Sequence, residues 1–418
     1  MSAADGPVVV VGAGAAGLMA AIFAATADRQ VLLLERTKDG GRKIIISGGG
    51  RCNVLPSTLS PTQFVTESSP NTLRNMLLSW PLPLQQRFFE RDLGVPLALE
   101  KSSGKLFPVS NRARDVRDAL IGEARRRGAE VRFDCTVQDI VPAGLHRWNV
   151  ELSGGTTIEA ASVIVATGGL SVPATGSDGA GLRILERLGH TVHDTYPALT
   201  PLTCEPPRHA ALAGVSLNLR LTAPLMKGRF EADGGFLFTH RGYSGPAVLN
   251  ISHLAVRSKG SGVRPQPILV QWTDMDTDAW DAALREGGAG QVGPLVRRHL
   301  PARLAEVLVE ESGVDAERTL AELRREERAR LVTTLARYPL PWTGDEGYRK
   351  AEVTGGGVAL SELDPRTLES RRQHGLFVCG EALDAFGPIG GYNFAWAWAT
   401  GRAAGLGAVR VDLDSIDE

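Results

Sequence analysis

Three glycines near the start of the chain have the spacing of a dinucleotide-binding turn. Gly12, Gly14 and Gly17 follow a short β-branched apolar run and open a segment of small apolar residues. In such a turn the first glycine permits a sharp bend, the second lets a pyrophosphate approach the backbone, and the third allows close helix packing. The free N–H groups at the helix start favour phosphate. We therefore expect a dinucleotide site here, with Ala15 and Ala16 in the turn.

An acidic residue ends the next apolar run and indicates which dinucleotide is bound. Glu35 lies about 20 residues beyond the glycines, where a carboxylate accepts hydrogen bonds from ribose hydroxyls. This position favours FAD or NAD over NADP, and Arg36 beside it is included in the expected site. The alternative is a glycine-rich turn in an unrelated α/β protein.

A second glycine-rich loop is expected to wrap the same cofactor. Loops with many exposed N–H groups bind anions or lie against a flat ring. The alternative is a flexible connector. Cys52 in this loop is either a reactive thiol, because positive dipoles lower the pKa of a nearby thiol, or a structural one. The residues expected to contact the cofactor are Arg42, Lys43, Ser47, Gly48, Gly49, Gly50, Arg51, Cys52 and Asn53.

Near the end of the chain, a third strand is followed by an acid and a glycine turn. Residues 375–379 form an apolar run that ends in Gly380 and Glu381. If the cofactor carries a flavin, Glu381 is placed to bond its ribityl hydroxyls, the alternative being a surface acid. Gly390, Gly391, Tyr392 and Asn393 then open a helix, whose N–H groups favour the flavin edge where negative charge collects.

Composition and charge set limits on function. The 418 residues carry a net charge of -1, which predicts neither a nucleic-acid partner nor a membrane-surface role. No secretory leader and no apolar run of membrane-spanning length is evident, so we expect a cytoplasmic protein. The four cysteines are far apart and none forms a CxxC pair, which argues against a redox disulfide and against a metal site.

A change in composition and in predicted secondary structure after residue 190 indicates an inserted domain. Beyond residue 190 prolines become frequent, and residues 216–222, 228–232 and 235–238 are predicted strands. Residues 294–310, interrupted at Pro301, and residues 315–337 are predicted helices. We expect an α/β fold: a discontinuous Rossmann-type FAD-binding domain (1–193 and 346–418) with an inserted β-barrel-like part (194–275) and a helical part (276–345).

Longer motifs resemble one family. The stretches RKIIISGGGRCN, ATGGLSVPATGSDGAG, YPALTPL, FTHRGYSGPA and EVTGGGV are similar to bacterial flavoproteins that include aminoacetone oxidases and bile-acid ring reductases. The resemblance spans the whole chain and implies bound FAD in a glutathione-reductase-like domain. It also implies that Thr167, Gly168 and Gly169 pass the FAD pyrophosphate and that Val137 contacts adenine through its backbone. No covalent attachment site is evident, so we expect the FAD to be held non-covalently.

The expected reaction is hydride transfer between flavin N5 and a small-molecule substrate, in a crevice between the FAD domain and the insert. Because the sequence has one GxGxxG, NAD(P)H would bind transiently without its own Rossmann domain. One alternative is an oxidase that uses oxygen, and another is a non-catalytic FAD-binding regulator or RNA-modification accessory. His240 is the candidate acid–base residue, the alternative being a histidine that caps a helix or bonds backbone carbonyls. The sequence does not predict the oligomeric state.

Overall fold

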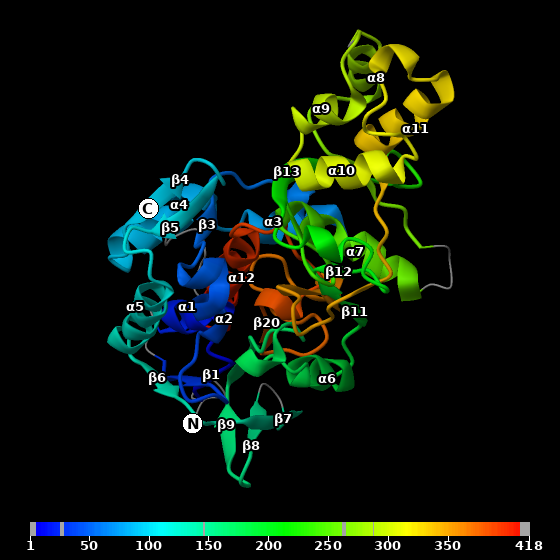
Figure 1. The fold of residues 1–418 in the computed structure, drawn as a ribbon. Helices are drawn as coiled ribbons and strands as arrows, with labels where there is room; N and C mark the ends of the chain where they lie inside the picture. The colour runs from blue at the N-terminus through cyan, green and yellow to red at the C-terminus, as the bar shows by residue number, and fades with distance from the viewer. Residues whose placement is uncertain (1–5, 26–28, 145–146, 261–264, 287, 410–418) are drawn as a thin grey trace. The chain divides into compact units, whose positions relative to one another are not determined.

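The chain forms two compact units, each with its own apolar core (Figure 1). The computed structural model describes residues 6–25, 29–144, 147–260, 265–286 and 288–409. The first unit is made of Met1–Tyr196 and Val353–Glu418, and the second of Pro197–Glu352. The chain therefore leaves the first unit once and returns to it.

A five-stranded parallel sheet forms the centre of the first unit. Its order is β20-β10-β1-β2-β6, with β1 in the middle. Parallel strands covered on both faces consist of continuous apolar runs, and β1 and β2 are buried at every position. This is the Rossmann-type arrangement that the sequence predicted. The strands are β1 (Val8–Val11), β2 (Val31–Leu34), β6 (Ala129–Arg132), β10 (Ser162–Val165) and β20 (Leu376–Val378).

Two helices of the first unit pack with their backbones in close contact. A side chain added at Gly401 or Gly405 of α12 (Tyr392–Ala408) would lie 2.4 Å from a carbonyl oxygen of α1 (Ala15–Ala24). The packing of α12 on α1 thus requires glycine at positions 401 and 405. Trp396 and Trp398 of α12 are buried and belong to the core of this unit.

Smaller elements complete the first unit. The strands β3, β5 and β4 form one three-stranded sheet, β7, β8 and β9 form another, and β11 pairs with β19. The bounds are α2 (Arg42–Ile46), β3 (Leu55–Pro56), α3 (Pro70–Leu77), α4 (Leu82–Arg87), β4 (Leu97–Glu100), β5 (Lys105–Pro108), α5 (Ala113–Arg126), β7 (Val137–Pro142), β8 (Trp148–Leu152), β9 (Thr157–Ala160), α6 (Ala180–Arg187), β11 (Val192–Ala198) and β19 (Val353–Val358).

The second unit contains a seven-stranded antiparallel sheet in the order β17-β16-β13-β14-β15-β12-β18. The separate strands predicted at 228–232 and 235–238 are wrong, because β14 runs unbroken from Arg229 to Phe238. Gly234 and Gly235 lie within β14, and Pro246 packs over them. A Cβ atom added at either position would lie about 3.5 Å from the Pro246 side chain. The other strands are β12 (Leu202–Thr203), β13 (Ser216–Pro224), β15 (Gly242–Ser244), β16 (Leu269–Gln271), β17 (Tyr338–Pro339) and β18 (Gly344–Asp345).

Helices form the rest of the second unit. Pro301 separates α9 from α10, as predicted. The helix predicted over 315–337 begins only at Arg325, because the backbone of 316 and 318 instead accepts hydrogen bonds from the start of α9. The helices are α7 (Pro246–Gly260), α8 (Thr277–Glu286), α9 (Val292–Arg297), α10 (Ala302–Glu311) and α11 (Arg325–Ala336). In the described part of the chain, no helix has the length and apolar character needed to span a membrane.

Candidate functional site

The glycine turn between β1 and α1 leaves open space where a pyrophosphate is expected. Gly12 has a φ of 101°, and Gly17 is pressed against it: a Cβ on Gly17 would lie 1.8 Å from the Gly12 carbonyl oxygen. Gly14 differs, because no atom lies within 4 Å of where its Cβ would be. Ala15 and Ala16 begin α1, whose first turn carries no acidic residue. The fold thus needs Gly12 and Gly17, whereas Gly14 keeps the helix start accessible to phosphate.

Glu35 is buried beside this turn and holds it in place. One carboxylate oxygen accepts a hydrogen bond from the Ala13 N–H at 2.8 Å, and the other accepts bonds from the N–H and hydroxyl of Thr37. These bonds fix the carboxylate at the end of β2, and its contact with ribose stays a prediction. Arg36 next to it forms a half-exposed ion pair with Asp178, a partner that the sequence did not indicate.

The glycine-rich loop is a short helical turn with open backbone. Gly48, Gly49 and Gly50 all have positive φ, and side chains at the last two would meet no atom within 4 Å. Ser47 bonds the carbonyl of Ile44 and so fixes the start of the turn. The loop therefore presents backbone N–H groups to solvent or to a ligand, as an anion-binding or ring-binding loop requires.

The side chains that flank this loop contact protein partners. Arg42 pairs with Asp39, and Arg51 pairs with Glu100 while its guanidinium lies 4.0 Å above the ring of Phe107. Their predicted contacts with the cofactor stay untested.

Cys52 and Asn53, the last residues of the loop, are buried. Burial raises the pKa of the Cys52 thiol to about 12. A hydrogen bond with Ser47 lowers this pKa, but its effect is smaller than that of burial. The thiol is therefore protonated at neutral pH, which favours the structural interpretation over the reactive one.

A charged cluster joins four segments of the first unit that are far apart in the chain. One oxygen of Glu381 accepts a hydrogen bond from the Lys43 ammonium at 2.6 Å. The other accepts from the hydroxyls of Ser171 (2.6 Å) and Thr354 (2.9 Å). Lys43 also donates to the Ser171 hydroxyl at 2.7 Å. The Thr354 N–H is a fourth donor to Glu381, at 3.1 Å, so Glu381 is not a surface acid. The sequence analysis did not select Ser171 or Thr354, although both stand in glycine-flanked motifs.

The end of β10 carries an unsatisfied polar group. The hydroxyl of Thr167 is buried, and no hydrogen-bond partner for it is found among the described residues. Gly168 has a φ of 73°, and a side chain on Gly169 would overlap Thr354. Buried polar atoms normally find a partner, so the Thr167 hydroxyl fits a site that receives a polar ligand.

The start of α12 is held against the rest of the first unit. Gly391 caps the helix with a φ of 99°, and a side chain there would lie 2.6 Å from the backbone of Leu55. Gly380 likewise touches Ala16, so the end of β20 reaches the start of α1. Asn393 bonds both the N–H and the carbonyl of Gly387.

The remaining residues of this region differ in how they are held. Gly390 precedes the cap with a φ of 122°, and Tyr392 accepts a hydrogen bond from Gln63. Val137 lies on β7, in a separate sheet of the first unit. All of the residues predicted to hold the cofactor are therefore in the first unit, and the parallel strands β1, β2, β10 and β20 bring most of them to one edge of the sheet.

Asp384 is a second acid near this edge that the sequence analysis did not select. One of its oxygens accepts hydrogen bonds from Thr66, Glu67 and Ser68, all at 2.9 Å. Burial raises the pKa of this carboxyl group, and the bonds from Ser68 and Thr66 oppose that effect. Asp384 therefore fixes the 66–68 loop to the segment that follows β20.

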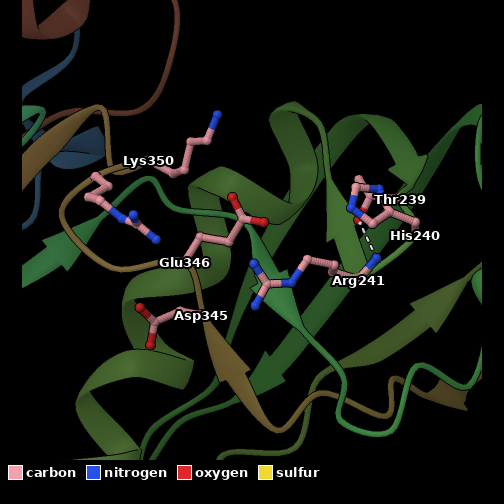
Figure 2. A pocket seen from close by; sticks show the side chains of 7 residues that line it. Thr239, His240, Arg241, Asp345, Glu346 and Lys350 are labelled. Carbon is pink, nitrogen blue, oxygen red and sulfur yellow. Dashed lines mark hydrogen bonds between the residues drawn. The ribbon is translucent and has the colours of Figure 1, made fainter.

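His240, the acid–base candidate, belongs to the second unit. It stands in the turn between β14 and β15, is exposed, and has no hydrogen-bond partner in the part of the chain that the structure describes. It therefore neither caps α7 nor bonds a carbonyl, and its acid–base role stays a prediction. His240 instead lines a cavity of about 630 Å³. The lining residues, most of them labelled in Figure 2, are Thr239, His240, Arg241, Asp345, Glu346, Arg349 and Lys350.

Comparison with known proteins identifies the family. A family profile described as "HI0933-like protein Rossmann domain" matches residues 6–407. The chain belongs to the HI0933-like family. It is an FAD-dependent oxidoreductase, as the sequence motifs predicted. The open space at Gly14 and the unpaired hydroxyl of Thr167 fit residues that hold this cofactor.

Two bacterial relatives of this HI0933-like protein match over nearly their full length. The ribosomal RNA dihydrouridine synthase of Escherichia coli K12 is 34% identical, covering 94% of this chain and 96% of the relative. The 3-dehydro-bile acid delta(4,6)-reductase of Clostridium scindens is 31% identical, covering 96% and 98%.

A solved structure supports the fold alone. The 3-ketosteroid delta1-dehydrogenase of Sterolibacterium denitrificans aligns with a TM-score of 0.52 at 13% identity, over 97% of this chain and 99% of that one. At this identity the likeness says nothing about substrate. It does agree with a Rossmann-type α/β protein that carries an insertion.

Proposed function

We propose that this protein is an NAD(P)H-linked flavin reductase that saturates a carbon–carbon double bond conjugated with a carbonyl group. Two relatives support this reaction class. Dihydrouridine is uridine whose C5–C6 double bond, conjugated with the C4 carbonyl, has been reduced. A delta(4,6)-reductase of 3-dehydro-bile acids likewise removes ring double bonds near a keto group. The two names describe different substrates but one kind of bond.

The open glycine turn at Gly14 is the observation that carries the proposal. At this turn a dinucleotide's pyrophosphate can meet the start of α1 without obstruction by a side chain at position 14. When bound there, FAD supplies the capacity to accept and donate hydride. Because the sequence has one such fingerprint, NAD(P)H is expected to visit transiently.

The chain's own residues then have positioning tasks. Lys43, Ser171 and Thr354 hold the Glu381 carboxylate at the end of β20. The backbone N–H groups at the start of α12, behind Gly391, favour negative charge that develops on a ligand in front of them. Asp384 keeps the 66–68 loop against the segment after β20.

A uridine in RNA is the specific substrate to test beside a small enone. The observation in its favour is that relatives from two bacteria, at 34% and 30% identity, are ribosomal RNA dihydrouridine synthases. The net charge of -1 predicts no nucleic-acid partner, and that expectation is untested. Total charge reports poorly on a local basic patch, so the substrate experiment has to include RNA.

The experiment is anaerobic mixing of the FAD-loaded protein with NADH and, separately, NADPH. The oxidised flavin band at roughly 450 nm is expected to bleach within seconds with at least one of them. The reduced protein is then mixed with ribosomal RNA that lacks dihydrouridine or with a steroid 4,6-dien-3-one. Return of the band, with dihydrouridine or the saturated ring found by mass spectrometry, identifies the substrate.

Failure to bleach would contradict the NAD(P)H-linked reductase. A screen of amines for hydrogen peroxide production would then test the oxidase alternative.

A further inference from the structure

The cavity that contains His240 has an unusual charge pattern. Arg241, Arg349 and Lys350 are exposed on its wall, and none of them forms an ion pair with another described residue. Some exposed arginines elsewhere in the second unit, such as Arg208, Arg220 and Arg229, are paired with carboxylates. The cavity thus brings together three cations that have no carboxylate partner among the described residues.

The two acids of the cavity do not neutralise these cations. Asp345 accepts a hydrogen bond from the Gly347 N–H at 2.8 Å, and Glu346 forms no side-chain bond within the described residues. Three cations thus face two carboxylates, before any charge on His240 is counted. Figure 2 shows His240 and Arg241 on the β14–β15 side, with Asp345 at the end of β18 and Glu346 and Lys350 on the segment that follows it.

This mixture matches a ligand that carries both an anion and hydroxyl groups. Guanidinium and ammonium groups bind phosphate oxygens, arginine in a two-pronged geometry. A free carboxylate such as Glu346 accepts hydrogen bonds from sugar hydroxyls, as acidic residues do in dinucleotide sites. The cavity volume of about 630 Å³ falls in the usual range for small-molecule sites.

We propose that this cavity binds a ribose phosphate, with the phosphate on Arg241, Arg349 and Lys350 and the hydroxyls on Glu346. Two sources carry this chemistry: the 2′-phosphoribose of NADPH and the backbone of RNA. Binding of a ribose phosphate at this cavity does not depend on the reductase reaction. The roles of NADPH as hydride donor and of RNA as substrate rest on the proposed function. The test therefore measures binding to the oxidised, FAD-saturated protein, in which no turnover occurs and the Gly14 turn is already filled.

Calorimetric titration with adenosine 2′,5′-bisphosphate and with a short oligouridylate distinguishes the two sources. The double variant Arg241→Ala, Arg349→Ala is expected to lower the association constant of the true source at least tenfold and to flatten its dependence on salt. Arg298→Ala is the matched control, because Arg298 is exposed in the same unit and lies outside the cavity. Glu346→Gln should weaken binding while leaving the salt dependence unchanged.

The outcomes are separable. Loss of bisphosphate binding alone assigns the cavity to NADPH, loss of oligouridylate binding alone assigns it to RNA, and loss of both assigns it to ribose phosphate in general. The proposal is overturned if neither probe binds the wild-type protein, or if the double variant and Arg298→Ala bind both probes equally well. A protein that binds a probe here but is not bleached by NAD(P)H would contradict the proposed function and leave this site standing.

Discussion

The ammonium of Lys43 lies 2.6 Å from a carboxylate oxygen of Glu381, although 338 positions separate the two residues in the chain. The pair joins the segment before the glycine-rich loop to the segment after β20. Both side chains are about one-fifth exposed, so water screens their attraction only in part. The two segments meet because they follow β2 and β20, which belong to one parallel sheet whose strands end at the same edge.

Removal of the cation should loosen this connection. Lys43→Met leaves the Glu381 carboxylate with its bonds from Ser171 and Thr354 but without a counter-charge, at an expected cost of about 1–2 kcal/mol. The variant should melt earlier and release FAD more readily, which thermal denaturation and flavin fluorescence of the filtrate measure. Lys38→Met is the control, since Lys38 is exposed and outside the cluster. Equal melting of the two variants would show that the pair contributes nothing.

An added methyl group should lower FAD affinity at Gly14 and protein stability at Gly17. Gly14→Ala places a Cβ in open space, so the free energy of unfolding of the apoprotein should change by less than about 0.5 kcal/mol while FAD affinity falls at least tenfold. Gly17→Ala drives a Cβ to 1.8 Å from a carbonyl oxygen and should destabilise the apoprotein itself. Apoprotein melting and FAD titration separate the two effects. Unchanged FAD affinity in Gly14→Ala would contradict the placement of the FAD pyrophosphate at this turn.

The sequence predicted this region well because its signals are local. The glycine spacing, the apolar runs and the acid at Glu35 each follow from neighbouring residues, and the parallel sheet follows from their order. The sequence analysis did not select Ser171, Thr354 or Asp384, because a hydroxyl or an acid in a glycine-rich segment has no distinctive spacing. Their partners are brought together only by the folded sheet. The sequence analysis also missed that β14 is one unbroken strand. The pair Gly234 and Gly235 indicates a break in a strand unless a residue from elsewhere in the chain, here Pro246, packs over the two glycines.

Cys52 should resist alkylation in the folded protein. Its thiol is buried, and with a pKa raised to about 12 the thiolate fraction at pH 8 is on the order of 10⁻⁴. Iodoacetamide at pH 8 should therefore modify Cys52 only after unfolding, as mass spectrometry of peptides from native and denatured protein will report. Cys135 provides the internal comparison, because it is partly exposed and should react first. Rapid native labelling of Cys52 would revive the reactive interpretation.

The partly buried acid Glu311 should make the second unit sensitive to acid. Burial acts to raise the pKa of this carboxyl group, but hydrogen bonds from His209 and Tyr338, and the Arg208 guanidinium, together lower it from 4.5 to about 2. A depressed pKa means that the folded state binds fewer protons than the unfolded state. The resulting stability is present above pH 4.5 and is lost as the pH falls through 4.5 towards 2.

Glu311→Gln should therefore cost on the order of 2 kcal/mol at pH 7, after allowance for partial solvent contact, and progressively less as the pH falls towards 3. Thermal denaturation from pH 7 to pH 3 measures this convergence of the two melting curves. Glu310→Gln is the matched control, because the neighbouring side chain is exposed and forms no hydrogen bond within the described residues. A melting difference between wild type and Glu311→Gln that stays constant over this range would mean that the carboxylate's charge does not stabilise the cluster, and that the variant loses packing alone.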